Sequence, residues 1–132
     1  MDKPTSEEIE TRLAQVQSGD TLYRHWMKGI CYTEGVRFAA ELCGAYWLID
    51  AIASHQFGKV KAEPFQVWTL HVASKDAPKQ KNSVAAILIC TDGDKGDGAV
   101  ELARQNIEYT DFPIDKITIW VEDGVMLLPA EH

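Results

Sequence analysis

The chain has 132 residues, of which 45% are hydrophobic and 25% are charged, and 13 Lys and Arg against 20 Asp and Glu give it a net charge of −7. This balance is typical of one globular domain, here spanning 1–132, and its acidity disfavours binding to the polyanionic backbone of DNA or RNA. No run of about 18 uncharged apolar residues occurs, and the first residues are rich in acids, so we expect a cytoplasmic protein without a membrane span or a secretion signal.

Residues 1–19 predict a surface helix that extends the domain at its N-terminus. Thr5, followed three residues later by Glu8, is the pattern of a capping box. Ile9 and Leu13 then recur on one side of the helix and form only a narrow apolar stripe. We therefore expect this helix to pack on the outside of the core.

The stretch 33–55, with the sequence TEGVRFAAELCGAYWLIDAIASH, is apolar or small at nearly every position. It predicts one continuous helix, about 30 Å long, that is buried as the spine of the core. The hydroxyl group of Thr33 is placed to accept a backbone N–H as the N-cap of this helix, and Glu34 lies near the positive end of the helix dipole.

Asp50 is the polar residue that interrupts this apolar pattern. It shares a helix face with Cys43 and Tyr46, so we expect it to be largely buried, and a buried carboxylate requires hydrogen-bond donors or a cation. Two interpretations stay open: a structural carboxylate that ties a loop to the helix, or a poised acid, base or ligand anchor. The candidate buried polar cluster consists of Arg24, His25, Tyr32, Thr33, Asp50 and Asp111.

From Pro64 onward the apolar period changes from that of a helix to that of strands. Residues 63–74 alternate, and the run VAAILIC at 84–90 is apolar on both faces, as in a central strand. Glu122-Asp123-Gly124 predicts a hairpin between two final strands, and an exposed edge of that hairpin could pair with a second copy of the chain. The connections are too short for crossover helices. We therefore expect an α+β fold in which the buried central helix packs on a mostly antiparallel sheet of three to five strands.

Signatures of metal, cofactor and nucleophile chemistry are missing from the sequence. The acidic loop 91–98 has Asp97 where a calcium loop requires glycine, and Ala103 where it requires glutamate. The three cysteines form no CxxC pair and lie in apolar runs, so we expect buried, reduced thiols. We therefore assign no catalytic residue, no metal ligand and no cofactor.

The final third is the acidic part of the chain. Residues 91–132 hold ten acidic and three basic residues, a net charge of −7. An acidic surface attracts the basic faces of other proteins, so this asymmetry favours a protein partner, although the acids can also serve only to solvate loops. The candidate acidic interaction surface consists of Asp92, Asp94, Asp97 and Glu101.

Five short motifs resemble a family of small, uncharacterised bacterial proteins that phages, prophages and plasmids often carry. These motifs are Tyr32–Val36, Gly44–Ala53, Phe65–Trp68, Thr110–Pro113 and Leu128–Pro129. The resemblance covers about 22–131 and departs at Glu34, where the family has aspartate. It implies no established activity.

Together, these features favour a non-enzymatic protein that binds a protein partner. Such a protein could be an inhibitor or accessory factor with which a mobile element acts on a host or defence complex. The acidic final third, the missing catalytic motifs and the resemblance support this interpretation. The alternative is an enzyme or small-ligand binder with its site around Tyr32, Thr33 and Asp50.

Overall fold

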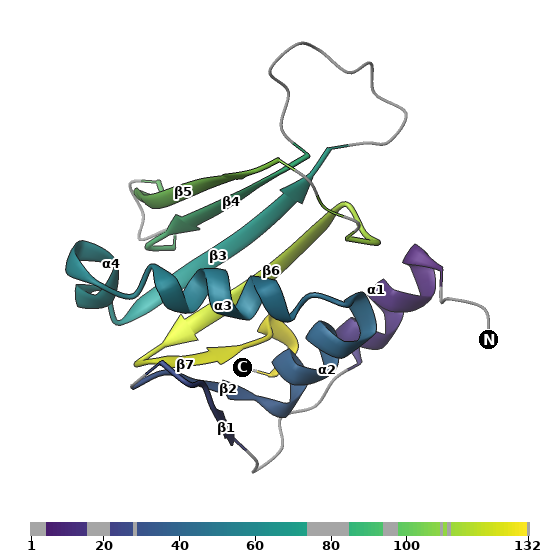
Figure 1. The fold of residues 1–132 in the computed structure, drawn as a ribbon, viewed down its shortest axis with the longest axis horizontal. Coiled ribbons are helices and arrows are strands. Elements are labelled where there is room, and N and C mark those ends of the chain that lie inside the picture. Colours follow the sequence, from purple (N-terminus) through teal and green to yellow (C-terminus); the bar gives the residue numbers. More distant parts are fainter. Residues whose placement is uncertain are drawn as a thin grey trace.

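The computed structural model describes residues 5–15, 22–27, 29–73, 85–93, 98–108, 110 and 112–131, apart from the side chain of Lys59 (Figure 1). Its helices are α1 (Ser6–Ala14), α2 (Glu34–Cys43), α3 (Tyr46–Ser54), α4 (Gly58–Ala62) and the 3-10 helix Pro129–Glu131. Its strands are β1 (Leu22–Arg24), β2 (Cys31–Thr33), β3 (Phe65–Val72), β4 (Ala86–Thr91), β5 (Glu101–Ile107), β6 (Lys116–Glu122) and β7 (Val125–Leu127). None of the described helices has the length and apolar character needed to cross a membrane.

The seven strands form one mixed sheet in the order β1-β2-β7-β6-β3-β4-β5. The expected α+β content is present, but the prediction of a sheet of three to five strands packed on one central helix is wrong, because the described sheet has seven strands and several short helices pack on it. All neighbouring strands are antiparallel except β2 and β7, which run parallel although most of the chain separates them. β1, β2 and β7 have three residues each, too few to show a period of two in the sequence.

The stretch expected as one helix forms two, α2 and α3, and this prediction is also wrong. Gly44 adopts a left-handed conformation, with φ of 64°, and the N–H groups of Gly44 and Ala45 both bond to the carbonyl of Ala40. A glycine accepts this conformation without the clash of a Cβ atom, so the helix ends there. The predicted N-cap is confirmed, because the Thr33 hydroxyl accepts the N–H of Val36 at 3.2 Å.

The predicted N-terminal helix is confirmed in α1. The Thr5 hydroxyl accepts the N–H of Glu8 at 3.2 Å, and Ile9 is buried in the core. The Ser6 hydroxyl donates to the carbonyl of Pro113 at 2.7 Å, which ties α1 to the chain just before β6. Residues 1–4 and 16–19 of the predicted helix lie outside the described residues.

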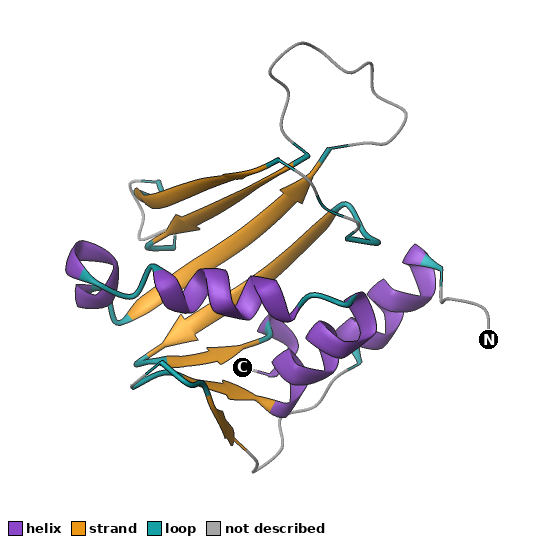
Figure 2. Ribbon diagram, viewed as in Figure 1, coloured by secondary structure: helices purple, strands orange, loops and turns teal. Residues whose placement is uncertain are grey.

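The core lies between one face of the sheet and the helices α2 and α3 (Figure 2). Along β3, β4 and β6, alternate residues such as Trp68, Leu88 and Ile119 are buried on this side. The residues between them are half-buried or exposed and point to the opposite side. The domain therefore has two layers, with the described helices on one side of the sheet.

The predicted C-terminal hairpin is confirmed in β6 and β7, but its position differs from the expected one. Asp123 and Gly124 both have positive φ, 51° and 83°, as a two-residue hairpin turn requires. β7 pairs with β6 on one side and with β2 on the other, so the final strand has no free edge for a second copy. The sheet instead ends at β1 and β5.

Candidate functional site

The structure divides the predicted polar cluster among separate contacts. His25 and Thr33 are buried, Tyr32 is half-buried, and Arg24 and Asp50 are exposed. His25 contacts Asp50, whereas Thr33 contacts Glu131 and Tyr32 stacks on Tyr23. Asp111 lies outside the described residues.

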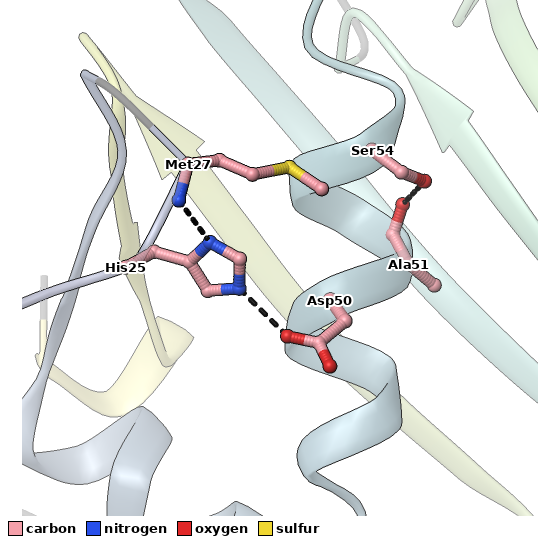
Figure 3. Close-up of polar contacts among 5 residues, drawn as sticks. All are labelled: His25, Met27, Asp50, Ala51 and Ser54. Atoms are coloured by element: carbon pink, nitrogen blue, oxygen red, sulfur yellow. Dashed lines mark hydrogen bonds and ion pairs between the residues drawn. The ribbon is translucent and has the colours of Figure 1, made fainter.

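His25 and Asp50 join the loop after β1 to α3 (Figure 3). Nε2 of His25 lies 2.7 Å from Oδ1 of Asp50, and the histidine is only 5% exposed. The expected burial of Asp50 is wrong, since its side chain is 55% exposed. The break at Gly44 sets the orientation of α3 independently of α2, and the row Tyr46, Asp50 and Ser54 faces solvent.

Both ring nitrogens of His25 are used. The backbone N–H of Met27 donates to Nδ1 at 3.1 Å, so Nδ1 accepts and Nε2 carries the hydrogen that is donated to Asp50. A histidine held in this way has no free nitrogen with which to take a proton from a substrate. The pair therefore fixes the loop against the helix, as the structural interpretation of Asp50 proposed.

The loop held by His25 presents a tryptophan to solvent. Trp26 is 76% exposed, and its ring centroid lies 5.2 Å from that of His25. Beside it, Asp50 follows Tyr46 by one helical turn on the exposed row of α3. Trp26 lies against His25, His25 bonds to Asp50, and Asp50 shares the exposed row of α3 with Tyr46. We call this group of side chains the aromatic surface; it consists of Tyr23, Trp26, Arg37, Glu41, Tyr46 and Asp50.

Polar contacts join the members of the aromatic surface on α2. Arg37 donates to the Tyr23 hydroxyl at 2.7 Å and to Glu41 at 3.2 Å, while the Tyr46 hydroxyl donates to the same Glu41 oxygen at 2.9 Å. The hydrogen bond to Tyr23 is the main cause that raises the pKa of Arg37. Partial removal from water, followed by the hydrogen bond to Glu41, raises the pKa of Tyr46. The guanidinium therefore stays charged and the phenol stays neutral near pH 7.

A buried carboxylate that the sequence did not single out lies at the start of α2. Glu131 is 8% exposed, and its Oε1 accepts from the Thr33 hydroxyl at 2.6 Å and from the Leu128 N–H at 2.9 Å. Its Oε2 accepts the N–H of Gly35 at 3.3 Å. A Cβ atom on residue 35 would overlap the Glu131 carboxyl, so a larger side chain there would have to displace that carboxyl from its hydrogen bonds. The Tyr32–Val36 and Leu128–Pro129 motifs thus meet at one structural contact.

A second buried network accounts for the Phe65–Trp68 motif. Gln66 is 2% exposed; its oxygen accepts from the Trp68 indole at 2.9 Å and from Gln56 at 2.8 Å. Its nitrogen donates to the carbonyls of Val60 and Glu63, around the end of α4. Every polar atom of this side chain has a partner, so the network fixes α4 against β3 and leaves no atom for a ligand.

The two buried thiols are poor nucleophiles. Burial raises the pKa of Cys43 to about 11 and is the main cause that raises the pKa of Cys90 to about 12. Both therefore stay protonated near pH 7, and a thiol, unlike a thiolate, is a weak nucleophile. Cys31, the cysteine nearest to His25 in sequence, is half-buried.

The predicted acidic interaction surface is described only in part. Asp92 accepts the N–H of Val100 at 2.8 Å and closes the turn between β4 and β5. Glu101 pairs with Arg104 at 2.7 Å. Asp94 and Asp97 lie outside the described residues. Among the residues that are described, no three His, Cys, Asp or Glu side chains gather closely enough to hold a metal ion.

The comparison with known proteins gives one match. The model of DUF6876, described as a family of unknown function, matches residues 7–132. No curated protein and no solved structure matches the chain.

Proposed function

Since the chain belongs to DUF6876, a family of unknown function, we propose its role from the geometry: it is a non-enzymatic protein that binds a protein partner through the aromatic surface. The proposal keeps the expected class of function and moves the contact from the acidic loop to the outer side of α2 and α3. From the sequence resemblance we also propose that a phage or another mobile element encodes the protein, and that the partner belongs to a host or defence complex.

The exposure of Trp26 is the observation that carries this proposal. A tryptophan that is 76% exposed leaves a large apolar area in water, and buried tryptophans contribute strongly to protein interfaces. The loop on which it stands is held by both nitrogens of His25. The partner therefore meets a side chain whose backbone is already ordered, which lowers the entropic cost of binding.

The residues around Trp26 match the composition of binding hot spots. Tyr, Trp and Arg are enriched in such sites, and Tyr23, Tyr46 and Arg37 lie within the aromatic surface. Glu41 and the exposed Asp50 add negative charge. With a net charge of −7 on the chain, we expect a partner with a basic face around an apolar pocket for the indole.

The alternative site for a small ligand has less support from the geometry. It required Tyr32, Thr33 and Asp50 to face one space, and their side chains make separate contacts with Tyr23, Glu131 and His25. The Thr33 hydroxyl already accepts one hydrogen bond and donates another. We therefore keep partner binding as the proposal.

The test is affinity capture of a partner by the full chain, with two matched variants. Trp26→Ala should raise the dissociation constant at least 30-fold, about 2 kcal/mol, because it removes the central apolar contact. Phe57→Ala is the control, since Phe57 is also strongly exposed, at 68%, but lies between α3 and α4. The measurement is mass spectrometry of the captured proteins followed by titration calorimetry with the purified partner.

Two outcomes would overturn the proposal. One is a stoichiometric partner that Trp26→Ala and the wild type bind equally well. The other is a chain that retains no stoichiometric protein at low salt but is stabilised against heat by a metabolite, with Asp50→Asn abolishing that stabilisation. The second outcome would establish the small-ligand alternative.

A further inference from the structure

A pocket of about 290 Å³ lies between the loop that joins β1 to β2 and the helices α3 and α4. The loop contributes Met27, Gly29 and Ile30, and Figure 3 shows the Met27 side chain extending from the loop toward α3. At about 30 Å³ for each water-sized group, a space of this volume holds about ten non-hydrogen atoms. The pocket therefore has room for a small organic molecule.

Buried hydrogen bonds hold both walls of this pocket in place. On the loop side, the N–H of Met27 donates to the buried His25, which is itself bonded to α3. On the helix side, the amide of Gln56 exchanges hydrogen bonds with the buried Gln66, which also donates to the carbonyl of Val60 in α4. Because these walls are ordered before a ligand arrives, binding costs less conformational entropy.

The lining combines apolar side chains with one positive charge. Met27, Ile30 and Ala53 give the pocket an apolar part, and Ile30 and Ala53 are themselves buried. Lys61 of α4 also lines the pocket and is exposed, and it makes no ion pair with any residue that the structure describes. Its ammonium group is therefore available to an anionic ligand that enters from solvent.

The other polar side chains of the pocket already donate within the chain. Both hydrogens of the Gln56 amide are donated to oxygen atoms of neighbouring residues. The Ser54 hydroxyl donates to the carbonyl of Ala51 at 2.6 Å, so toward a ligand it can only accept (Figure 3). Within the described lining, Lys61 is thus the side chain that has donors left for a ligand, and those donors carry a charge.

We propose that this pocket binds a small organic carboxylate, with its apolar part against Met27, Ile30 and Ala53 and its carboxylate group on Lys61. One ammonium group balances one negative charge, whereas the net charge of −7 on the chain disfavours a phosphate or a nucleotide, which brings more negative charge. The pocket shares no lining residue with the aromatic surface, so this ligand site is additional to the proposed partner binding.

The first test is titration of the isotope-labelled full chain with benzoate, followed by NMR. Benzoate should shift the backbone signals of Met27, Gly29 and Ser54 in a saturable way. Benzamide, its neutral analogue, should bind about 3- to 10-fold more weakly, because it lacks the charge that Lys61 recognises. No saturable shift up to about 10 mM benzoate, or equal binding of benzamide, would overturn the proposal. Tighter binding of phenyl phosphate than of benzoate would overturn the assignment to a carboxylate.

The second test compares two lysine variants in the same titration. Lys61→Met removes the charge but keeps an apolar stem, and its exposed position spares the fold, so we expect benzoate binding to weaken about 3- to 10-fold. Lys116→Met is the matched control, because Lys116 is an exposed lysine on β6 that does not line this pocket, and it should leave binding unchanged. Circular dichroism establishes that both variants are folded.

Equal benzoate affinities of the wild type and Lys61→Met would overturn the proposal, and so would equal losses in the two lysine variants. Trp26→Ala should retain benzoate binding, because Trp26 does not line the pocket and His25 still holds the loop. The carboxylate site and the partner site can therefore fail separately: one is measured with benzoate and Lys61→Met, and the other with the captured partner and Trp26→Ala.

Discussion

Two carboxylates, Glu131 and Asp50, hold distant parts of the chain together, but their surroundings differ. Glu131 accepts three hydrogen bonds from Thr33, Gly35 and Leu128, and it is buried. Asp50 accepts from the buried His25 through one oxygen and keeps much of its side chain in water. The first contact joins the end of the chain to the start of α2, and the second joins the loop after β1 to α3.

The difference separates a structural contact from one that is open to a partner. Around Glu131 every donor is internal, and no carboxylate surface is left for another molecule. Around Asp50 the histidine is satisfied, while the outer carboxylate oxygen and the neighbouring Trp26 remain at the surface. Loss of Glu131 should therefore reduce stability, whereas changes around Asp50 should mainly reduce binding.

Glu131→Ala should cause the largest loss of stability. It leaves the Thr33 hydroxyl and the N–H groups of Gly35 and Leu128 without their acceptor in a buried place, so we expect a loss of about 3–5 kcal/mol. The loss in the free energy of unfolding is measured by urea denaturation, with circular dichroism as the signal. Glu108→Ala, at an exposed glutamate, is the control and should change stability by less than about 0.5 kcal/mol. If Glu131→Ala and Glu108→Ala reduced the free energy of unfolding equally, Glu131 would not be a structural contact of the kind proposed here.

Gly35→Ala should come next, with a loss of about 2–3 kcal/mol. The new methyl group would overlap the Glu131 carboxyl, and moving that carboxyl aside would break its hydrogen bonds with Thr33, Gly35 and Leu128. A double-mutant cycle identifies the cause: in the Glu131→Ala background the same substitution should cost much less, because the overlapping group is gone. Additive effects in this cycle would show that the cost comes from another part of α2.

The buried thiol at the end of α2 predicts a smaller effect that depends on pH. Because burial raises the pKa of Cys43 to about 11, an unfolded chain releases this proton near pH 8.5 while the folded chain still retains it. The stabilisation is complete below about pH 8.5 and is lost as the pH rises toward 11. Between pH 8 and 10 the stability of the wild type should therefore fall by about 2 kcal/mol more than that of Cys43→Ala, measured by urea unfolding at both values. If the stability of the wild type and that of Cys43→Ala fell in parallel with rising pH, the prediction for Cys43 would be contradicted.

Asp50→Asn should have the smallest effect on stability, about 0.5 kcal/mol. Its carboxylate is largely in water, where ion pairs contribute little, and the asparagine oxygen can still accept from His25. Thermal unfolding of this variant and of His25→Ala provides the comparison, since loss of the buried histidine should cost more. A large loss for Asp50→Asn would place this carboxylate in the same class as Glu131.

Local features of the fold could be predicted from short stretches of sequence. The caps at Thr5 and Thr33 and the hairpin turn at Asp123 and Gly124 are all confirmed. Each depends on a side chain or a conformation within three or four residues, so nothing distant is needed to identify it. The break at Gly44 was equally local, but the apolar residues on both sides concealed it.

The sequence by itself determined these local elements and their apolar faces, and tertiary contacts decided the candidate site. The strand pair β2–β7, the partner of Glu131 and the exposure of Asp50 all depend on residues far apart in the chain. Asp50 lies on an apolar helix whose neighbours predicted burial, and only the direction in which α3 packs leaves it in water. Burial is a property of three-dimensional neighbours, and a periodic pattern can show that a helix has an inner side without showing which layer will cover it.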